Sequence, residues 1–159
     1  MQLESLYQEI ILDHYRSPHH AGLAAEYDVE VHHVNPSCGD EVTLRVELDG
    51  DVVTGVTHES QGCSISQAST SVMSDLVIGK SVADGMAAYE KFRELMQGRG
   101  RAVEPDSEDA EVLEDGIAFA GVAQFPARVK CALLGWSAWR DATAQALAKT
   151  DDNSGVSNA

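Results

Sequence analysis

The sequence predicts an α+β fold in which a small three-stranded antiparallel sheet is packed by about five to six helices. Three segments between residues 29 and 60 alternate apolar with polar residues, which is the pattern of strands that bury one face. After residue 64, apolar residues recur every three or four positions, as they do on amphipathic helices. Strands followed by a run of helices are typical of the α+β class.

The beginning of the chain predicts a helix that precedes the sheet. Its apolar residues recur at helical spacing, and Pro18 ends the pattern. The first two strands are expected at 29–34 and 42–48, and an Asp-Gly-Asp turn at 49–51 leads to a third strand over 52–60. The predicted apolar face of the first helix comprises Leu3, Leu6, Tyr7, Ile10, Ile11 and His14.

Four helical segments follow the strands. The first ends at Gly79, and Ser81 has the spacing of an N-cap for the second. An acidic connection over 104–109 leads to a short helix expected at about 110–122. Pro126 suits the first turn of the last helix, because its missing N–H is not needed there.

Length and charge exclude several classes of function. The 159 residues provide for one domain over 1–149 and a flexible, polar tail over 150–159. With 26 acidic against 11 basic side chains, the net charge of −15 repels phosphate backbones and anionic membranes. We therefore expect neither nucleic acid nor a membrane as a partner, whereas a basic protein is favoured.

Three cysteines are the residues best suited to chemistry. The sequence shows no export signal and no run of 18 apolar residues, so we expect a cytoplasmic protein with reduced thiols. Cys38 lies in the loop N-P-S-C-G-D, Cys63 begins a helix after Q-G, and Cys131 lies in the first turns of the last helix. Helix N-termini favour the thiolate, which is the form that binds metals and attacks sulfur.

Asp40, two residues after Cys38, adds an oxygen donor to the cysteines. With Gly39 between them, both side chains can turn toward one point, and three thiolates with one carboxylate make a four-coordinate shell that suits zinc. Such a shell carries excess negative charge, which Arg128, three residues before Cys131, is placed to balance. Two alternatives stay open here, since an isolated cysteine is commonly a small buried apolar residue and Asp40 also suits a turn.

The histidines are weaker candidates for a site. His32 and His33 are neighbours on a predicted strand, so they face opposite sides and cannot bind one metal ion. His19 and His20 are expected in a solvated loop, although the nearness of the first helix leaves a binding role open.

Three motifs stand in order along the chain: N-P-S-C-G-D, G-C-S-I-S-Q-A-S-T-S and F-P-A-R-V-K-C-A. Together they resemble the IscU/SufU family of iron–sulfur cluster assembly proteins, and the likeness runs from I-L-D-H-Y-R-S-P to about Ala148. The details resemble the SufU branch. The path between the second and third cysteines is extended around 98–114, Lys130 replaces the histidine of IscU-type scaffolds, and F-P-A-R-V replaces their L-P-P-V-K chaperone motif.

The resemblance implies a zinc-dependent sulfurtransferase that is a co-substrate and activator of a PLP-dependent cysteine desulfurase of the SufS type. By motif match, the zinc ligands are Cys38, Asp40, Cys63 and Cys131. The family mechanism implies that a histidine of the desulfurase displaces Cys38 from zinc, and that the freed thiolate attacks the desulfurase persulfide. The position of Cys38 on a loop agrees with this role, because a loop ligand swings out with little loss of structure. Downstream SUF cluster-assembly proteins would receive the sulfur, and Arg128 is expected to support turnover.

Two further functions stay open. The same four ligands suit a scaffold on which a [2Fe–2S] cluster is built, with iron in place of zinc, because thiolate sites discriminate weakly between the two metals. A structural zinc domain acting as an adaptor would unfold without metal but leave desulfurase activity untouched. Sulfur uptake that depends on Cys38 separates the first function from both.

Overall fold

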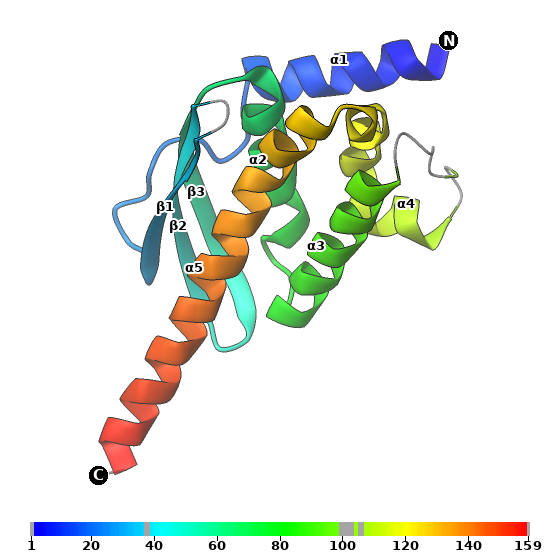
Figure 1. Cartoon of the computed structure of the whole chain (residues 1–159). Helices are drawn as coiled ribbons and strands as arrows, with labels where there is room; N and C mark the ends of the chain where they lie inside the picture. Colours follow the sequence, from blue (N-terminus) through cyan, green and yellow to red (C-terminus); the bar gives the residue numbers. More distant parts are fainter. Residues whose placement is uncertain (1, 37–38, 99–103, 105–106, 159) are drawn as a thin grey trace.

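The computed structural model describes residues 2–36, 39–98, 104 and 107–158 (Figure 1). It confirms the predicted α+β class, with a three-stranded antiparallel sheet and helices packed against it. The elements are α1 (Gln2–Arg16), β1 (Val29–Asn35), β2 (Asp40–Asp49), β3 (Val52–Gln61), α2 (Ser64–Val77), α3 (Val82–Gln97), α4 (Glu108–Leu113), the 3₁₀ helix η1 (Glu114–Gln124) and α5 (Pro126–Asn158).

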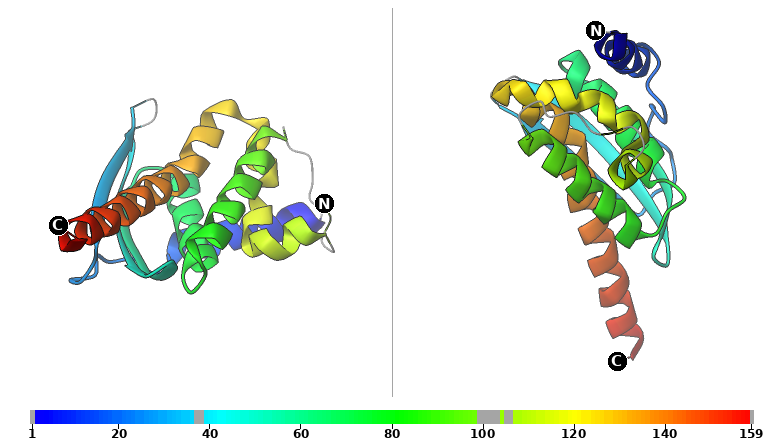
Figure 2. Two further views of the ribbon diagram at one scale, coloured as in Figure 1. Left: turned by 90° about the horizontal axis from the view of Figure 1, so that it is seen from below. Right: turned by 90° about the vertical axis from the view of Figure 1, so that its right-hand side faces the viewer.

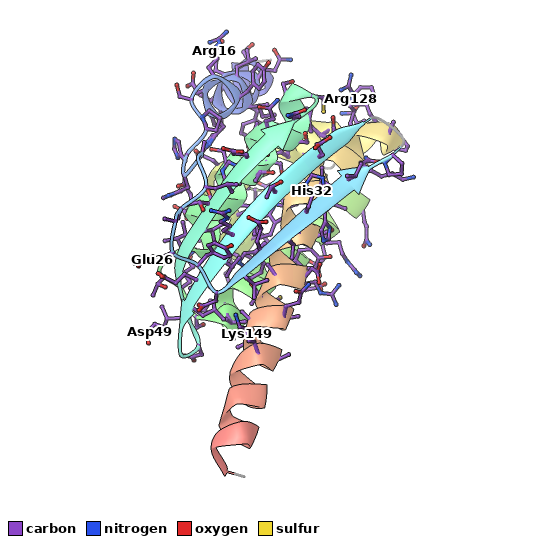
Figure 3. The ribbon with its side chains drawn as sticks, turned by 90° about the vertical axis from the view of Figure 1, so that its left-hand side faces the viewer. Arg16, Glu26, His32, Asp49, Arg128 and Lys149 are labelled. Carbon is purple, nitrogen blue, oxygen red and sulfur yellow. The ribbon has the colours of Figure 1, made fainter. Side chains whose placement is uncertain are left out.

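The sheet has the order β1-β2-β3, and each strand is antiparallel to the next. Strand β2 is central, and its inward residues Val42, Leu44 and Val46 are at most 1% exposed. The helices cover one face of the sheet, as seen end-on in Figure 2, and the other face is open in Figure 3. The alternation read from the sequence therefore corresponds to one buried and one solvated face.

Helices α2 and α5 form the layer next to the sheet and approach each other closely. A Cβ atom at Gly135 of α5 would lie 2.2 Å from Oγ1 of Thr70 in α2, so only glycine permits this separation. Trp136 and Trp139 of α5 are fully buried in the core that these helices share with α3. The close contact sets the middle of α2 against the N-terminal third of α5, and the two described cysteines lie toward the starts of these helices.

The single helix expected at about 110–122 is divided into a short α-helix and a 3₁₀ helix, which together extend over 108–124. Helix α4 is capped by Ser107, whose hydroxyl accepts from the Ala110 N–H at 3.2 Å, and ends at Leu113. Glu114 then adopts a left-handed φ of 46°, which breaks the α-helical hydrogen-bond ladder, and the chain continues as η1. Apolar periodicity alone does not reveal such a break.

Helix α5 continues to Asn158, through the segment 150–158 that the sequence assigns to a tail, and its C-terminal end projects beyond the sheet in Figures 1 and 2. The domain boundary at residue 149 stays a prediction. Among the residues that the structure describes, none of the helices combines the length and apolar character that a membrane span requires.

Candidate metal centre

Asp40 carries the carboxylate of the candidate site into the interior. It begins β2, pairs with Asn35 of β1 across the sheet, and is only 1% exposed. Gly39 before it has a left-handed φ of 75° at the entry to β2. This backbone conformation is strained for other residues but not for glycine. Cys38, the predicted zinc ligand and nucleophile, lies outside the described residues, two positions before Asp40.

Cys63 is held at the beginning of α2 by the same carboxylate. It occupies the N-cap position with extended backbone angles, as the sequence predicts for a cysteine that begins a helix. Asp40 Oδ1 accepts a hydrogen bond from the Cys63 backbone N–H at 2.8 Å, and the Cys63 thiol donates to Oδ2 at 3.2 Å. The carboxylate therefore satisfies a free N–H group of the helix end and orients a thiol beside itself.

Gly62 makes this approach possible. Its φ is 125°, and a Cβ atom there would lie 2.0 Å from Oδ1 of Asp40 and 2.8 Å from the Asp40 Cα. Any other residue would have to displace the carboxylate or the end of β3. The sequence predicts that Cys63 begins a helix after Gln61-Gly62, but it does not reveal this role of Gly62.

Cys131 completes the described part of the site from α5. Its thiol lies one turn from the helix start, 3.6 Å from the Ala127 carbonyl oxygen, and the residue is 2% exposed. Asp40, Cys63 and Cys131 each offer one ligand atom, and these atoms all lie within 4.8 Å of one another. Residues separated by 91 positions along the chain, from 40 to 131, thus meet at one point.

The donor set fits zinc. Two sulfur atoms and one carboxylate oxygen are ligands that tetrahedral zinc sites use. That Cys38 adds a third sulfur stays a prediction from the sequence. Half-buried Cys63 leaves one side of the group open to solvent, so an ion or a partner can reach it.

Arg128 lies on the first turn of α5, and Figure 3 shows it at the end of the molecule where that helix begins. It is exposed, whereas Cys131 one turn later is buried. The guanidinium is therefore free to reach a solvent-facing group above the site. Its role in balancing charge stays a prediction.

A pocket of about 380 Å³ lies at the end of β3, beside the segment that carries Cys63, although Cys63 itself does not line it. Gln61 and Gln67, which flank Cys63 in sequence, line it together with Glu41 and Glu59. Burial lowers the pKa of His58, which also lines the pocket, and the nearby His20 adds to this effect, whereas the hydrogen bond to the His19 carbonyl opposes it. The pocket is thus acidic and contains a buried neutral imidazole.

The histidine pair of the first strand behaves as predicted. His32 is on the outer face, 3.6 Å from Glu41, whereas His33 faces α5 and lies 2.8 Å from Asp141. His19 and His20 both contact Asp75 of α2, a residue that no sequence pattern predicts to be part of a site. No local signal reveals this contact, because its partners are more than 50 positions apart.

Known proteins share both sequence and fold with this chain. Residues 6–132 match the family described as NifU-like N terminal domain. The chain belongs to this family. It is 39% identical over 136 residues to the zinc-dependent sulfurtransferase SufU of Bacillus subtilis. The aligned region covers 86% of this chain and 88% of that protein. It is also 38% identical over 156 residues to the iron–sulfur cluster assembly scaffold protein IscU of Streptococcus pyogenes. That alignment covers 96% of this chain and 93% of the relative.

Solved structures of NifU-like domains have the same fold. A NifU-like protein (N-terminal) from Brucella abortus superposes with a TM-score of 0.78 at 29% identity, over 94% of this chain and 99% of that one. A protein described as a SUF-system scaffold from Fervidobacterium islandicum AW-1 gives a TM-score of 0.72 at 35% identity, over 84% of this chain and 93% of that one. The resemblance to the IscU/SufU family is therefore confirmed for this NifU-like domain.

Proposed function

We propose that this NifU-like domain is a zinc-dependent sulfur acceptor of iron–sulfur cluster assembly, which takes persulfide sulfur from a PLP-dependent cysteine desulfurase onto Cys38. The observation that carries the proposal is the convergence of Asp40, Cys63 and Cys131, whose ligand atoms lie within 4.8 Å of one another. The name of the Bacillus subtilis relative, a zinc-dependent sulfurtransferase, supports the same function.

Zinc would be held by Asp40, Cys63 and Cys131, with Cys38 as the fourth ligand. When bound, the ion stabilises thiolates at neutral pH without taking part in redox chemistry. Asp40 and the starts of α2 and α5 hold the other two cysteines in place. Cys38 differs from them because it belongs to the connection between two strands, where a ligand can move with the least disturbance of packing.

The sulfur-transfer step is a thiol exchange at the desulfurase persulfide. The Cys38 thiolate attacks the outer sulfur, so a new sulfur–sulfur bond forms at Cys38. The bond between that sulfur and the desulfurase cysteine breaks, and its electron pair leaves with the desulfurase cysteine as a thiolate. The persulfide changes its carrier at an unchanged oxidation level, so no external oxidant or reductant is needed.

Charge supports a desulfurase of the SufS type with a basic docking face as the partner. The chain carries a net charge of −15, and Glu41 and Glu59 line the pocket beside Cys63. Such a field speeds association with a basic protein and weakens as salt is added. We place this exchange in the cytoplasm and expect the sulfur to pass on to downstream SUF cluster-assembly proteins.

The test measures alanine and sulfide release from the cysteine desulfurase of the same organism, with cysteine and a reductant present. Zinc-loaded protein should raise the rate strongly, and Cys38→Ala should abolish the increase while leaving the circular dichroism spectrum unchanged. Normal sulfur uptake by Cys38→Ala would remove Cys38 from the proposed role. Lys130→Ala, which changes an exposed residue next to Cys131, is the matched control and should retain the increase.

A scaffold for [2Fe–2S] cluster assembly is the second candidate. The scaffold name of the Streptococcus pyogenes relative favours it, and the same sulfur and carboxylate donors can hold a cluster. Anaerobic reconstitution that yields a stable cluster, transferable to an apo-acceptor, together with no effect on the desulfurase, would favour the scaffold over the sulfur acceptor.

A further inference from the structure

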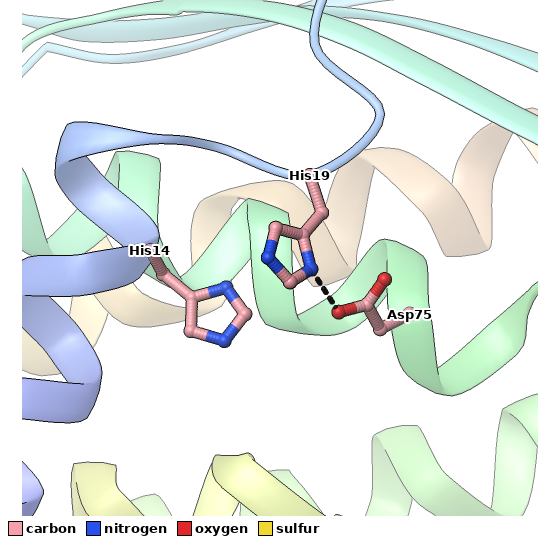
Figure 4. A group of neighbouring side chains, drawn as sticks. All are labelled: His14, His19 and Asp75. Atoms are coloured by element: carbon pink, nitrogen blue, oxygen red, sulfur yellow. Dashed lines mark hydrogen bonds and ion pairs between the residues drawn. The ribbon is translucent and has the colours of Figure 1, made fainter.

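A second group of metal-ligating side chains lies away from the cysteines, where α1, the following loop and α2 meet. His14 comes from the last turn of α1, His19 from the loop, and Asp75 from the end of α2 (Figure 4). Asp75 follows Cys63 by 12 residues, which is about 18 Å along a helix. The group is therefore separate from the candidate zinc site.

The geometry of this group resembles that of the cysteine site. His14, His19 and Asp75 each offer one ligand atom, and these atoms all lie within 4.8 Å of one another. The rings of His14 and His19 have centroids 4.5 Å apart, and His20 Nε2 lies 3.0 Å from Asp75 Oδ1. Donors around a tetrahedral zinc ion lie about 3.4 Å apart, so the group would close on an ion with shifts of about 1 Å.

The hydrogen bonds of His14 leave one nitrogen suited to a metal. Nε2 lies 3.0 Å from the Asp115 carboxylate, which only accepts, so this nitrogen carries the proton. In the neutral ring, Nδ1 then carries the lone pair, which accepts from the Ser71 hydroxyl at 2.7 Å and would bind an ion in place of that hydrogen bond. The same hydroxyl accepts from the His19 backbone N–H at 2.7 Å, so Nδ1 is on the side of His19. A histidine ligand whose other nitrogen donates to a carboxylate is the usual arrangement in metal sites.

His19 lies between the other two side chains of the group. Its Nδ1 contacts Asp75 Oδ2, and Figure 4 shows the other ring nitrogen facing His14. The loop is held in this position by two further features. His20 adopts a left-handed φ of 61°, and the His58 imidazole lies 2.8 Å from the His19 carbonyl oxygen. A non-glycine residue with positive φ that brings a side chain onto a carboxylate is backbone strain of the kind found at binding sites.

We propose that His14, His19 and Asp75 form a second site for a divalent transition metal ion of the zinc class, with His20 or water as a further ligand. Imidazole and carboxylate donors without sulfur suit zinc, cobalt and ferrous iron. The net charge of −15 attracts any cation. An ion there would hold the loop against α2. The same loop contributes Pro18, Ala21 and Gly22 to the lining of the pocket beside Cys63.

The experiment uses the full chain with its cysteine site first filled by one equivalent of zinc. Cobalt is then added, and absorption and histidine side-chain NMR are recorded. We expect a second equivalent to bind without sulfur-to-cobalt charge-transfer absorption and to shift the imidazole signals of His14 and His19. Both His19→Gln and Asp75→Asn should lose this second equivalent and keep the first. Asp115→Asn should weaken it about tenfold, because Asp115 orients His14.

His32→Gln is the matched control, because His32 is also an exposed histidine near a carboxylate, Glu41, but its neighbour His33 faces the opposite side of the sheet. It should bind the second cobalt as the unchanged protein does. The proposal is overturned when no second equivalent binds even with cobalt in large excess. It is equally overturned when both His19→Gln and Asp75→Asn retain that equivalent or when His32→Gln loses it. None of these readouts depends on sulfur transfer, so their failure would leave the proposed transfer to Cys38 untouched.

Discussion

Asp40 accepts a hydrogen bond from the Cys63 backbone N–H at 2.8 Å with one oxygen, and its other oxygen lies 3.2 Å from the Cys63 sulfur. One buried carboxylate thus joins the start of β2 to the start of α2 and orients a thiol at the same time. The site and the fold share this contact, so changes to it affect both stability and metal binding.

Replacing Asp40 separates these two effects. Asp40→Ala should lower the free energy of unfolding of the metal-free protein by about 1–3 kcal/mol, because it leaves the Cys63 N–H without its acceptor. Asp40→Asn keeps an oxygen acceptor and should cost less, whereas both variants should bind zinc more weakly because they lose the charged ligand. Urea unfolding and zinc competition titrations measure the two quantities. Equal destabilisation by the two substitutions would contradict the capping role.

Gly62→Ala should be more damaging than an ordinary substitution at a left-handed glycine. The new Cβ atom would overlap Asp40, whereas at Gly79, with a φ of 84°, nothing lies within 4 Å of the added atom. Gly79→Ala should cost about 1–2 kcal/mol of backbone strain. Gly62→Ala should cost clearly more and should also weaken zinc binding. Urea unfolding of both variants tests this, and similar losses of stability would mean that the carboxylate moves aside freely.

Arg128→Ala should reduce desulfurase stimulation while leaving stability almost unchanged. Arg128 is exposed, and truncating an exposed side chain away from the core seldom shifts the free energy of unfolding by more than about 0.5 kcal/mol. Lys130→Ala removes an exposed positive charge two residues away and serves as the control. Parallel loss of turnover and of thermal stability in Arg128→Ala would indicate a packing role instead.

Acidification should destabilise the protein partly through His58. Burial lowers the pKa of His58, so protonation favours the unfolded chain. The stability that the neutral His58 ring contributes is fully present above about pH 6.5, the ordinary imidazole pKa. It is lost as the pH falls from that value toward the lower pKa of the folded state. His58→Gln keeps a donor for the His19 carbonyl but does not titrate, so its free energy of unfolding should fall less steeply with pH. Urea unfolding from about pH 8 to 5 measures both slopes, and identical slopes would rule out this contribution.

Sequence patterns predicted those strands and helices in which apolar residues recur at the spacing of one buried face. The alternation in β2 and the N-cap at Ser81 are local features, and the structure reproduces both. The cysteine motifs also placed Asp40, Cys63 and Cys131 together before their distances were known. The break at Glu114 and the contacts of Asp75 with two histidines depend on tertiary packing, which no local pattern encodes. The role of Gly62 likewise becomes visible only with Asp40 beside it.

The spread of the candidate ligands along the chain has a consequence during synthesis. Asp40 and Cys63 leave the ribosome long before Cys131, which comes from the last helix. A growing chain therefore holds an incomplete ligand set until α5 has emerged and docked on α2. Insertion of the proposed zinc would therefore follow translation, and chains truncated before α5 should be recovered without firmly bound metal.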